Sequence, residues 1–490
     1  MRLKIFSITI AFLFFILFLG LVYIQLIRGR SYYELSENNH IRLIELDALR
    51  GTIFDRNGVV LADNKLTFDV AIVPQEFQDK NLPRLSKLLD TEVDLIRKKI
   101  KSGYTAPFAP VVVAKNIKKT QAILIEQQEF NLPGVVVQIK PQRYYPQRTA
   151  GAHVLGYVGM IDRSKITKLK NYGYKISDIV GYSGVEEYYD AYLRGEDGGI
   201  QVEVDNRGRQ LRVLGIRPSV KGKNMTLTID ARIQKIAADL LADNRGAIIV
   251  MQPETGEVLA LVSSPSFDPN HFTIEHSQKN INDLLNNYRS PMLNRAINAA
   301  FPPGSVFKII TTLAALGTKK ASIHTSFICQ GSFSVGSRSF ACWSTHGIQD
   351  LLQAITHSCN VCFYNLGLLV GPDILTKYAK EAKLAEKTQI DLPYEEKGNI
   401  PDRNQRKLTK KQDWYKGDTA NFAIGQGEVL ATPIQTVRLI AAIANSGELS
   451  QPYVAKYIEN KQINTTKFIG QLPFNKSDLD FLKMALRNVV

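Results

Sequence analysis

The stretch that decides the fold is Phe301-Pro-Pro-Gly-Ser-Val-Phe-Lys308, which runs directly into Ile309-Ile-Thr-Thr-Leu-Ala-Ala315. Two prolines and a glycine end whatever precedes them, and an apolar run that favours a helix then begins. Ser305 stands at the start of this run and Lys308 three residues later, so both side chains share one helix face. A nearby base activates a serine hydroxyl, and a lysine among apolar groups can become that base. The stretch therefore predicts a Ser-x-x-Lys acyl-transfer centre.

Two further motifs decide how this tetrapeptide is interpreted, because Ser-x-x-Lys alone also occurs by chance as a helix start with a solvated lysine. Ser358-Cys-Asn360 offers a second hydroxyl and a carboxamide that can reach the same cleft. The hydroxyl can relay a proton, and the amide can orient a substrate carbonyl or the lysine. Further on, Asn421-Phe-Ala-Ile-Gly-Gln-Gly427 predicts a glycine-rich bend before a helix that starts at Thr432-Pro433.

The composition is that of a globular protein with a basic surface. The 490 residues include 61 Lys and Arg against 46 Asp and Glu, which gives a net charge of +15. This surplus suits work beside anionic lipid or an anionic polymer. The sequence has no zinc-finger spacing, basic zipper or RNA-binding aromatic motif, so we expect no nucleic-acid partner.

The N-terminal segment predicts a membrane anchor. No residue from Ile5 to Ile27 is charged, and this span exceeds the roughly 20 apolar residues that cross a bilayer. Arg2 and Lys4 precede it, which favours a cytoplasmic tail of residues 1–4. The segment lacks the small-x-small exit of a cleavable signal peptide. We therefore expect an uncleaved, single-pass anchor in the cytoplasmic (inner) membrane, with the bulk of the chain in the periplasm.

The remainder of the chain has mixed α/β patterns in two parts. Residues 28–217 hold no catalytic pair, and we interpret them as a spacer or interaction domain. In this part, Asn57-Gly58 predicts a hairpin turn, and residues 199–214 predict another hairpin that is broken at residues 205–208. From residue 218 onward, the sequence predicts an amphipathic helix and a hairpin over residues 246–263 before the Ser305 stretch.

Together, four motifs resemble the motif set of class B penicillin-binding proteins, in particular the elongation-specific penicillin-binding protein 2 branch. They are Ser305-x-x-Lys308, Ser358-x-Asn360, Arg50-Gly-Thr-Ile-Phe-Asp-Arg-Asn-Gly58 and Ile424-Gly-Gln-Gly427. The resemblance covers nearly the whole chain. It implies an α/β (α+β) protein with an anchor at 5–27, an elongated pedestal (dimerisation) domain at 28–217, and a transpeptidase domain at 218–490 that is similar to serine β-lactamases.

The same resemblance implies the roles of the site residues and the function. Ser305 would be the acyl-forming nucleophile and Lys308 its base, with Ser358 and Asn360 as the second motif. The implied reaction is D,D-transpeptidation of peptidoglycan stem peptides during cell elongation, with β-lactams captured at Ser305. Implied partners are a RodA-type glycosyltransferase and other elongation-complex proteins. The alternatives are a non-catalytic scaffold or β-lactam receptor of the same fold, and a division-specific paralogue.

One family motif is absent from the sequence. The Lys-Thr/Ser-Gly strand, which in the family binds the substrate carboxylate and leads to an oxyanion-hole amide, does not follow Gly427. Loss of one oxyanion donor typically lowers a rate by about a hundred- to a thousandfold. We therefore expect a chain truncated at its C-terminal side, with weak activity or none. Acylation of residues 28–490 by penicillin at the rate of an intact relative would contradict this expectation.

The four cysteines fall close to the two site motifs, at positions 329, 342, 359 and 362. An even count outside the cytoplasm is compatible with disulfides. Alternatively, Cys329, Cys342, His346 and Cys359 form a tetrahedral ligand set. The resemblance favours structural Zn²⁺ at these four residues, since relatives can carry zinc at matching places. Cys362, about one turn after Cys359, is interpreted as a small buried hydrophobe.

Overall fold

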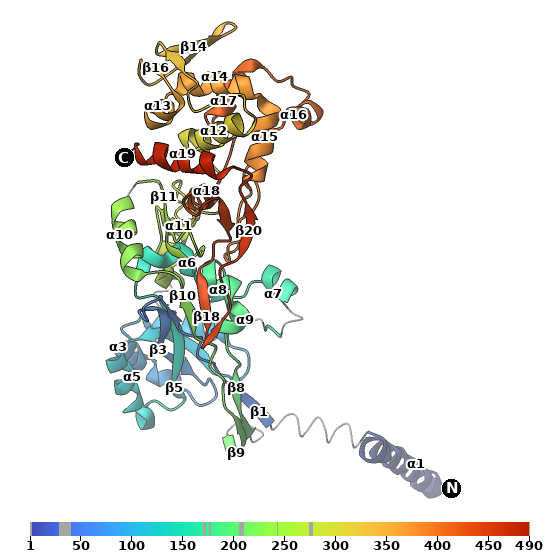
Figure 1. The fold of residues 1–490 in the computed structure, drawn as a ribbon. Coiled ribbons are helices and arrows are strands. Elements are labelled where there is room, and N and C mark those ends of the chain that lie inside the picture. Colours follow the sequence, from blue (N-terminus) through green and yellow to red (C-terminus); the bar gives the residue numbers. More distant parts are fainter. Residues whose placement is uncertain are drawn as a thin grey trace. The chain divides into compact units, whose positions relative to one another are not determined.

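The computed structural model describes residues 2–28, 41–169, 173–175, 178–204, 210–242, 244–273 and 278–489. Helices and strands alternate along this chain, which confirms the predicted mixed α/β class (Figure 1). The chain begins with helix α1 (Arg2–Val22) and a short π-helical turn (Tyr23–Ile27). The predicted transmembrane anchor is not confirmed, because no helix among the described residues is both long enough and apolar enough to cross a bilayer.

Contacts divide the chain into two compact units that interleave along the sequence. Unit 1 comprises Met1–Leu49, Lys65–Gln142 and Gly195–Gly222, and unit 2 comprises Arg50–Asn64, Arg143–Arg194 and Lys223–Val490. Two segments of the N-terminal half therefore belong to the unit that carries Ser305. The predicted boundary between residues 217 and 218 stays a prediction.

Unit 1 contains a three-stranded antiparallel sheet and several strands of a second, seven-stranded sheet. In the first sheet β8 lies between β1 and β9, and in the second β3 pairs with both β4 and β5. The predicted hairpin over residues 199–214 is confirmed by the pairing of Gly199 with Arg217, while residues 205–208 lie outside the described residues. The elements are β1 (Ile41–Leu46), β3 (Val60–Ile72), α3 (Leu82–Leu89), α4 (Val93–Gly103), β4 (Val111–Ile117), α5 (Lys119–Glu126), β5 (Val135–Tyr144), β8 (Gly198–Val204) and β9 (Gln210–Arg217).

The first part of unit 2 contains the two other predicted hairpin features. β2 turns at Asn57-Gly58 into the start of β3, and β11 pairs with β12 from Gly246 opposite Ser264. The elements are β2 (Ile53–Phe54), α6 (Ala152–Leu155), β6 (Val158–Met160), α7 (Arg163–Leu169), β7 (Ile179–Gly181), α8 (Gly184–Tyr188), α9 (Asp190–Leu193), β10 (Met225–Leu227), α10 (Ala231–Leu241), β11 (Gly246–Met251), β12 (Val258–Ser264) and α11 (Gln278–Leu285).

The remainder of unit 2 is mostly helical, with short hairpins between the helices (Figure 1). Its elements are α12 (Lys308–Gly317), β13 (Phe327–Cys329), β14 (Ser332–Val335), β15 (Arg338–Ala341), β16 (Gly347–Gln349), α13 (Leu351–Thr356), α14 (Asn360–Val370), α15 (Pro372–Glu381), α16 (Arg403–Lys410), α17 (Lys416–Ala423), α18 (Pro433–Ala444), β17 (Glu448–Ser450), β18 (Ala455–Ile458), β19 (Lys461–Gln462), β20 (Phe468–Gln471) and α19 (Lys476–Arg487).

Helix α12 forms the centre of this helical part. All its residues from Lys308 to Ala315 are buried, as expected for a helix that is apolar on every side. The hydroxyl of Thr311 donates to the carbonyl of Ala423 at 2.7 Å, so the buried polar group is satisfied. Helix α14 approaches α17 closely, because a Cβ on Gly367 would overlap with the Cβ of Ala423. This packing fixes α12, which carries the first motif, against the helix that carries the second.

A buried ion-pair network joins the Arg50–Asn64 and Arg143–Arg194 segments within unit 2. Glu186, with no exposed surface, accepts from Nε of Arg50 and from Nε of Arg143, each at 2.6 Å. Arg50 also pairs with Asp190 at 2.7 Å. Burial alone would raise the pKa of Glu186, but the guanidinium groups of Arg143 and Arg50 hold that pKa below its ordinary value. The carboxylate is therefore charged and fully partnered in the interior.

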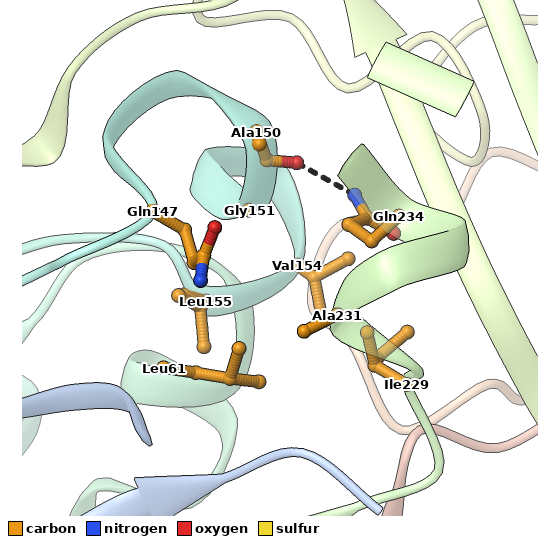
Figure 2. A pocket seen from close by; sticks show the side chains of 9 residues that line it. All are labelled: Leu61, Gln147, Ala150, Gly151, Val154, Leu155, Ile229, Ala231 and Gln234. Atoms are coloured by element: carbon orange, nitrogen blue, oxygen red, sulfur yellow. Dashed lines mark hydrogen bonds between the residues drawn. The ribbon is translucent and has the colours of Figure 1, made fainter. Parts of the chain in front are cut away.

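A small apolar cavity lies where α6 meets α10 (Figure 2). Its volume is about 10 Å³, which is close to the room that one water molecule requires. Gln234 closes one side, donating from Nε2 to the carbonyl of Ala150 at 2.7 Å (Figure 2). The same side chain also bonds with the backbone N–H and carbonyl of Leu261 on β12. This cavity is a packing feature that is too small for a ligand.

Candidate active site

Ser305 lies in a 3₁₀ turn, Gly304–Phe307, that leads directly into α12. The turn packs against the predicted glycine-rich bend, since the N–H of Gly304 donates to the carbonyl of Gly425 at 3.1 Å. A Cβ on Gly425 would overlap with the carbonyl oxygen of Gly304 and with Cβ of Phe307. Only glycine allows this approach, which explains why the bend at residues 424–427 belongs to the site.

Lys308 opens helix α12, and its side chain is buried beneath Ser305 and the second motif. Its amine donates to the carbonyl of Ser358 at 2.7 Å, contacts Oγ of Ser358 at 2.9 Å, and contacts Oδ1 of Asn360 at 2.8 Å. Burial lowers the pKa of Lys308 from its ordinary value of 10.5 to about 8. A large fraction of the amine is therefore neutral in mildly alkaline solution.

Ser358 stands between the nucleophile and the lysine. Its Oγ lies 2.9 Å from Oγ of Ser305 and 2.9 Å from Nζ of Lys308. The residue adopts φ of +49°, a left-handed conformation that is uncommon for a side chain other than glycine. It occupies the short connection between α13 and α14. Strain of this kind persists where the surrounding structure holds a functional group in place.

Asn360 is the first residue of helix α14, and both polar atoms of its side-chain amide are hydrogen-bonded. Its Oδ1 accepts from Lys308, while its Nδ2 donates to the carbonyl of Ala341 at 3.4 Å. Tyr364, one turn later on α14, donates to the same carbonyl at 3.2 Å. The β15 strand thus contributes a backbone group that orients the second motif.

The hydrogen-bonding partners of the Lys308 amine indicate the direction in which a proton can move. A charged lysine has three N–H donors, which match its three acceptors here. A neutral lysine has two donors and one lone pair, and two of its partners, the carbonyl of Ser358 and Oδ1 of Asn360, can only accept. The lone pair must then accept from the hydroxyl of Ser358, whose oxygen can in turn accept from Ser305. This arrangement would let a neutral Lys308 take up the Ser305 proton through Ser358.

Cys329, Cys342, His346 and Cys359 converge beside this site. Their ligand atoms all lie within 4.8 Å of one another, and the cysteines are free. Nδ1 of His346 is 3.5 Å from Sγ of Cys329 and 3.6 Å from Sγ of Cys342, and Cys342 lies 4.0 Å from Cys359. Tetrahedral zinc spaces sulfurs roughly 3.8 Å apart and sulfur from nitrogen roughly 3.5 Å apart. The four residues fit a zinc ion.

The cluster and the second motif share one turn of chain. Cys359 is the N-cap residue of α14, directly between Ser358 and Asn360. The backbone N–H of Asn360 also donates to Sγ of Cys342 at 3.3 Å. Sequence spacing did not reveal this bond, because the two residues lie on separate elements.

Two family profiles together cover most of the chain. Residues 45–227 match the penicillin-binding protein dimerisation domain, and residues 246–490 match the penicillin-binding protein transpeptidase domain. The peptidoglycan D,D-transpeptidase MrdA of Acinetobacter baumannii is 33% identical over 473 residues, which cover 94% of this chain and 70% of the relative. The chain belongs to the penicillin-binding proteins. MrdA of Escherichia coli is also 33% identical, over 90% of this chain and 71% of that relative.

Solved structures of penicillin-binding protein 2 share the fold. The Helicobacter pylori protein, solved in complex with MreC, superposes with a TM-score of 0.78 at 30% identity, over 91% of this chain and 84% of that one. A peptidoglycan synthase complex has a TM-score of 0.73 at 28% identity, over 100% of this chain and 84% of that one. The predicted resemblance to the penicillin-binding protein 2 branch and the predicted fold are confirmed.

The structure of this penicillin-binding protein brings together all four predicted catalytic residues, and separately all four predicted metal ligands. Sequence reasoning placed Lys308 directly beside Ser305, whereas Ser358 lies between them. It missed the carbonyl of Ala341 and the hydroxyl of Tyr364, since neither position carries a local signal. Ala341 lies at the end of a hairpin strand, 19 positions before Asn360 and 23 before Tyr364, so no periodic pattern in the sequence indicates this contact.

Proposed function

We propose that this protein is the peptidoglycan D,D-transpeptidase of cell elongation. The low rate expected from the absent Lys-Thr/Ser-Gly motif stays a prediction. The observation that carries the proposal is the continuous contact from Oγ of Ser305 through Oγ of Ser358 to Nζ of Lys308. Such an arrangement supplies an activated nucleophile and a route for its proton. The similarity to peptidoglycan D,D-transpeptidases supports the same reaction. Covalent capture of a labelled β-lactam at Ser305 tests it.

In the proposed reaction, Oγ of Ser305 forms a bond with the carbonyl carbon of the penultimate D-Ala. Its proton passes to Ser358, whose own proton passes to neutral Lys308. The peptide bond then breaks, and the terminal D-Ala leaves with a proton returned through Ser358. An amine of a neighbouring stem attacks the resulting ester and gives its proton back along the same route. This step restores the Ser305 hydroxyl and leaves the two stems cross-linked.

The rate of acylation is expected to rise with pH through about 8, the pKa of Lys308. Because burial lowers this pKa, the neutral base form increases as pH rises. A single group with a pKa of 8 predicts an increase of about 50-fold between pH 6 and pH 8 and a plateau above pH 9. Stopped-flow measurement of labelled penicillin acylation checks the profile. A rate that stays flat between pH 6 and 8 would contradict the role of Lys308.

We further propose that Cys329, Cys342, His346 and Cys359 hold a structural zinc ion. When bound, zinc would clamp β13, the β15–β16 connection and the start of α14 together. The support is the donor spacing described above and the set of three sulfurs with one imidazole nitrogen. The cluster lies behind the residues that carry protons, so no step of the reaction passes through it.

Replacement of Cys342 by serine is expected to remove most bound zinc. A hard hydroxyl is a poor substitute for thiolate, and the remaining three ligands leave the tetrahedron open. Elemental analysis of the purified protein measures zinc per chain. The matched control is Cys362→Ser, because Cys362 is the fourth cysteine of the sequence and lies outside the ligand set. Equal zinc content in wild type and Cys342→Ser would end this proposal.

The proposed function also implies a location in the cell and a set of partner proteins. We propose attachment to the inner membrane through residues 5–27, which carry no charge in the sequence. Fractionation of cells that express the full chain or a 5–27 deletion tests this placement. A penicillin-binding protein 2 has been solved with MreC, which supports elongation-complex proteins as partners here. A RodA-type glycosyltransferase and β-lactam inhibitors are proposed on the family resemblance.

A further inference from the structure

A second cavity in unit 2 is large enough for a ligand. Its volume is about 210 Å³, more than ten times the roughly 10–15 Å³ that a single water molecule needs. Among the residues that the structure describes, no aspartate, glutamate, lysine or arginine lines it. His153 lies at its wall, and burial lowers the pKa of this imidazole to about 4, so the ring is neutral. The cavity therefore offers an uncharged surface.

Aromatic rings form much of the wall. Tyr157 stacks on Tyr182, with centroids 5.8 Å apart and planes inclined by 8°. Phe267 meets Tyr157 edge-on at 6.1 Å. Asn294 and Asn298 also line the cavity. The amide of Asn294 is bonded to the backbone of His153 and Ala296, whereas Oδ1 of Asn298 adds a hydrogen-bond acceptor. A few polar groups among aromatic walls are the composition of small-molecule sites.

Tyr394 at the cavity is held in a strained conformation. Its φ is +65°, which is unusual for a bulky residue, and its side chain is 68% exposed, so core packing does not explain the strain. Asn298 donates to its carbonyl, and its hydroxyl donates to Glu187 at 2.7 Å. An exposed aromatic ring that is fixed on both sides despite backbone strain is a mark of a ligand clamp.

We infer that this cavity binds the glycan of the cell-wall polymer, as an uncharged saccharide. Pyranose rings present apolar C–H faces that pack on an exposed aromatic ring such as that of Tyr394, and their hydroxyl and N-acetyl N–H groups can donate to Oδ1 of Asn298. A charged ligand would lack a counter-charge at this wall. The choice of the polymer's glycan rests on the proposed function, because the same substrate presents its stem peptides to Ser305.

The cavity wall connects directly to the nucleophile turn. Asn298 precedes Ser305 by seven residues, which limits their separation to about 25 Å. A backbone bridge pairs Phe301 with Ala431, and a second pairs Asn399 with Leu430. The segment that follows Asn298 and the segment that follows Tyr394 therefore both pair with residues 430–431, just after the glycine-rich bend. A glycan bound here stays within reach of the catalytic site.

The test is calorimetric titration of the full chain with chitotetraose, a neutral tetramer of N-acetylglucosamine. We expect saturable binding, weakened about tenfold or more by Tyr394→Ala and retained within about threefold by Tyr394→Phe, which keeps the ring. Tyr288→Ala is the matched control, since Tyr288 is 88% exposed and does not line the cavity. Ser305→Ala is expected to bind chitotetraose as the wild type does.

Several outcomes would overturn the inference. They are the absence of saturable binding, equal affinity of wild type and Tyr394→Ala, or loss of binding in Ser305→Ala, which would place the sugar in the catalytic site. Equal binding of maltotetraose would exclude recognition of the N-acetyl groups. Thermal unfolding shows that each variant is folded. A failure of the proposed function can be told apart from a failure of this inference. If the proposed function is wrong, Ser305 is not labelled by a β-lactam, whatever the chitotetraose titration shows.

Discussion

Replacement of Ser305 by alanine is expected to abolish covalent labelling by penicillin. The hydroxyl is the atom that becomes the ester oxygen, and no neighbouring group can take its place at the head of the proton route. Ser358→Ala, in contrast, keeps the nucleophile and removes the relay, so labelling should slow by about a hundred- to ten-thousandfold and still reach completion. Intact-mass spectrometry after long incubation with excess penicillin measures both.

Comparison of Ser305→Ala with Ser358→Ala distinguishes the nucleophile from the residue that relays its proton. Complete labelling of Ser305→Ala would assign the ester to another residue, and peptide mapping would identify it. Labelling of Ser358→Ala at the wild-type rate would mean that Lys308 reaches Ser305 without help. A wild-type chain that forms no acyl-enzyme at all would favour the non-catalytic scaffold of the same fold.

Glu186→Gln is expected to destabilise the protein by about 3–5 kcal/mol, the usual cost of removing one partner from a buried ion pair. Glutamine preserves the shape of the side chain, but Arg50 and Arg143 then keep their charges in the interior with less compensation. Chemical denaturation, followed by tryptophan fluorescence, gives the free energy of unfolding. Glu381→Gln is the matched control, because Glu381 makes only an exposed pair with Lys377 at 3.9 Å and should change stability by less than about 1 kcal/mol.

The pH dependence of this effect has a definite sign. The folded state holds the pKa of Glu186 below its ordinary value, so its contribution is fully present at neutral pH and is lost as pH falls through the folded pKa. The difference between wild type and Glu186→Gln should therefore shrink on acidification. A difference that grows toward low pH would mean that the carboxyl is protonated in the native protein.

Local sequence signals predicted the elements that depend on local physics. Asn57-Gly58 marked a turn because its backbone conformation suits few other residues, and Gly58 has φ of +86°. Ser305 and Lys308 were placed on one helix face because three residues make about one helical turn, and both contact Ser358. Thr432 was predicted as a cap, and its Oγ1 accepts from the N–H of Gln435 at 3.4 Å. In each case the residues concerned lie within four positions of one another.

Contacts between residues that are far apart in the sequence could not be predicted from such local signals. Arg50 and Glu186 are 136 positions apart, and neither shows a periodicity that indicates the other. For the same reason, the sequence did not reveal that the Arg50–Asn64 and Arg143–Arg194 segments belong to unit 2. The position of Ser358 between Ser305 and Lys308 depends on how α12 packs against α14. Packing of this kind is a property of the whole helical core.

The turn Ser358-Cys359-Asn360 also constrains where substitutions could weaken the proposed capture of a β-lactam at Ser305. Resistance by substitution requires residues that tolerate change while the natural reaction continues. In this turn the two outer side chains contact Lys308 and the central one faces the sulfur and imidazole cluster. A change at any of its three positions disturbs either the proton route or the cluster behind it. Resistance mutations should therefore arise away from this turn, at positions that control access to Ser305.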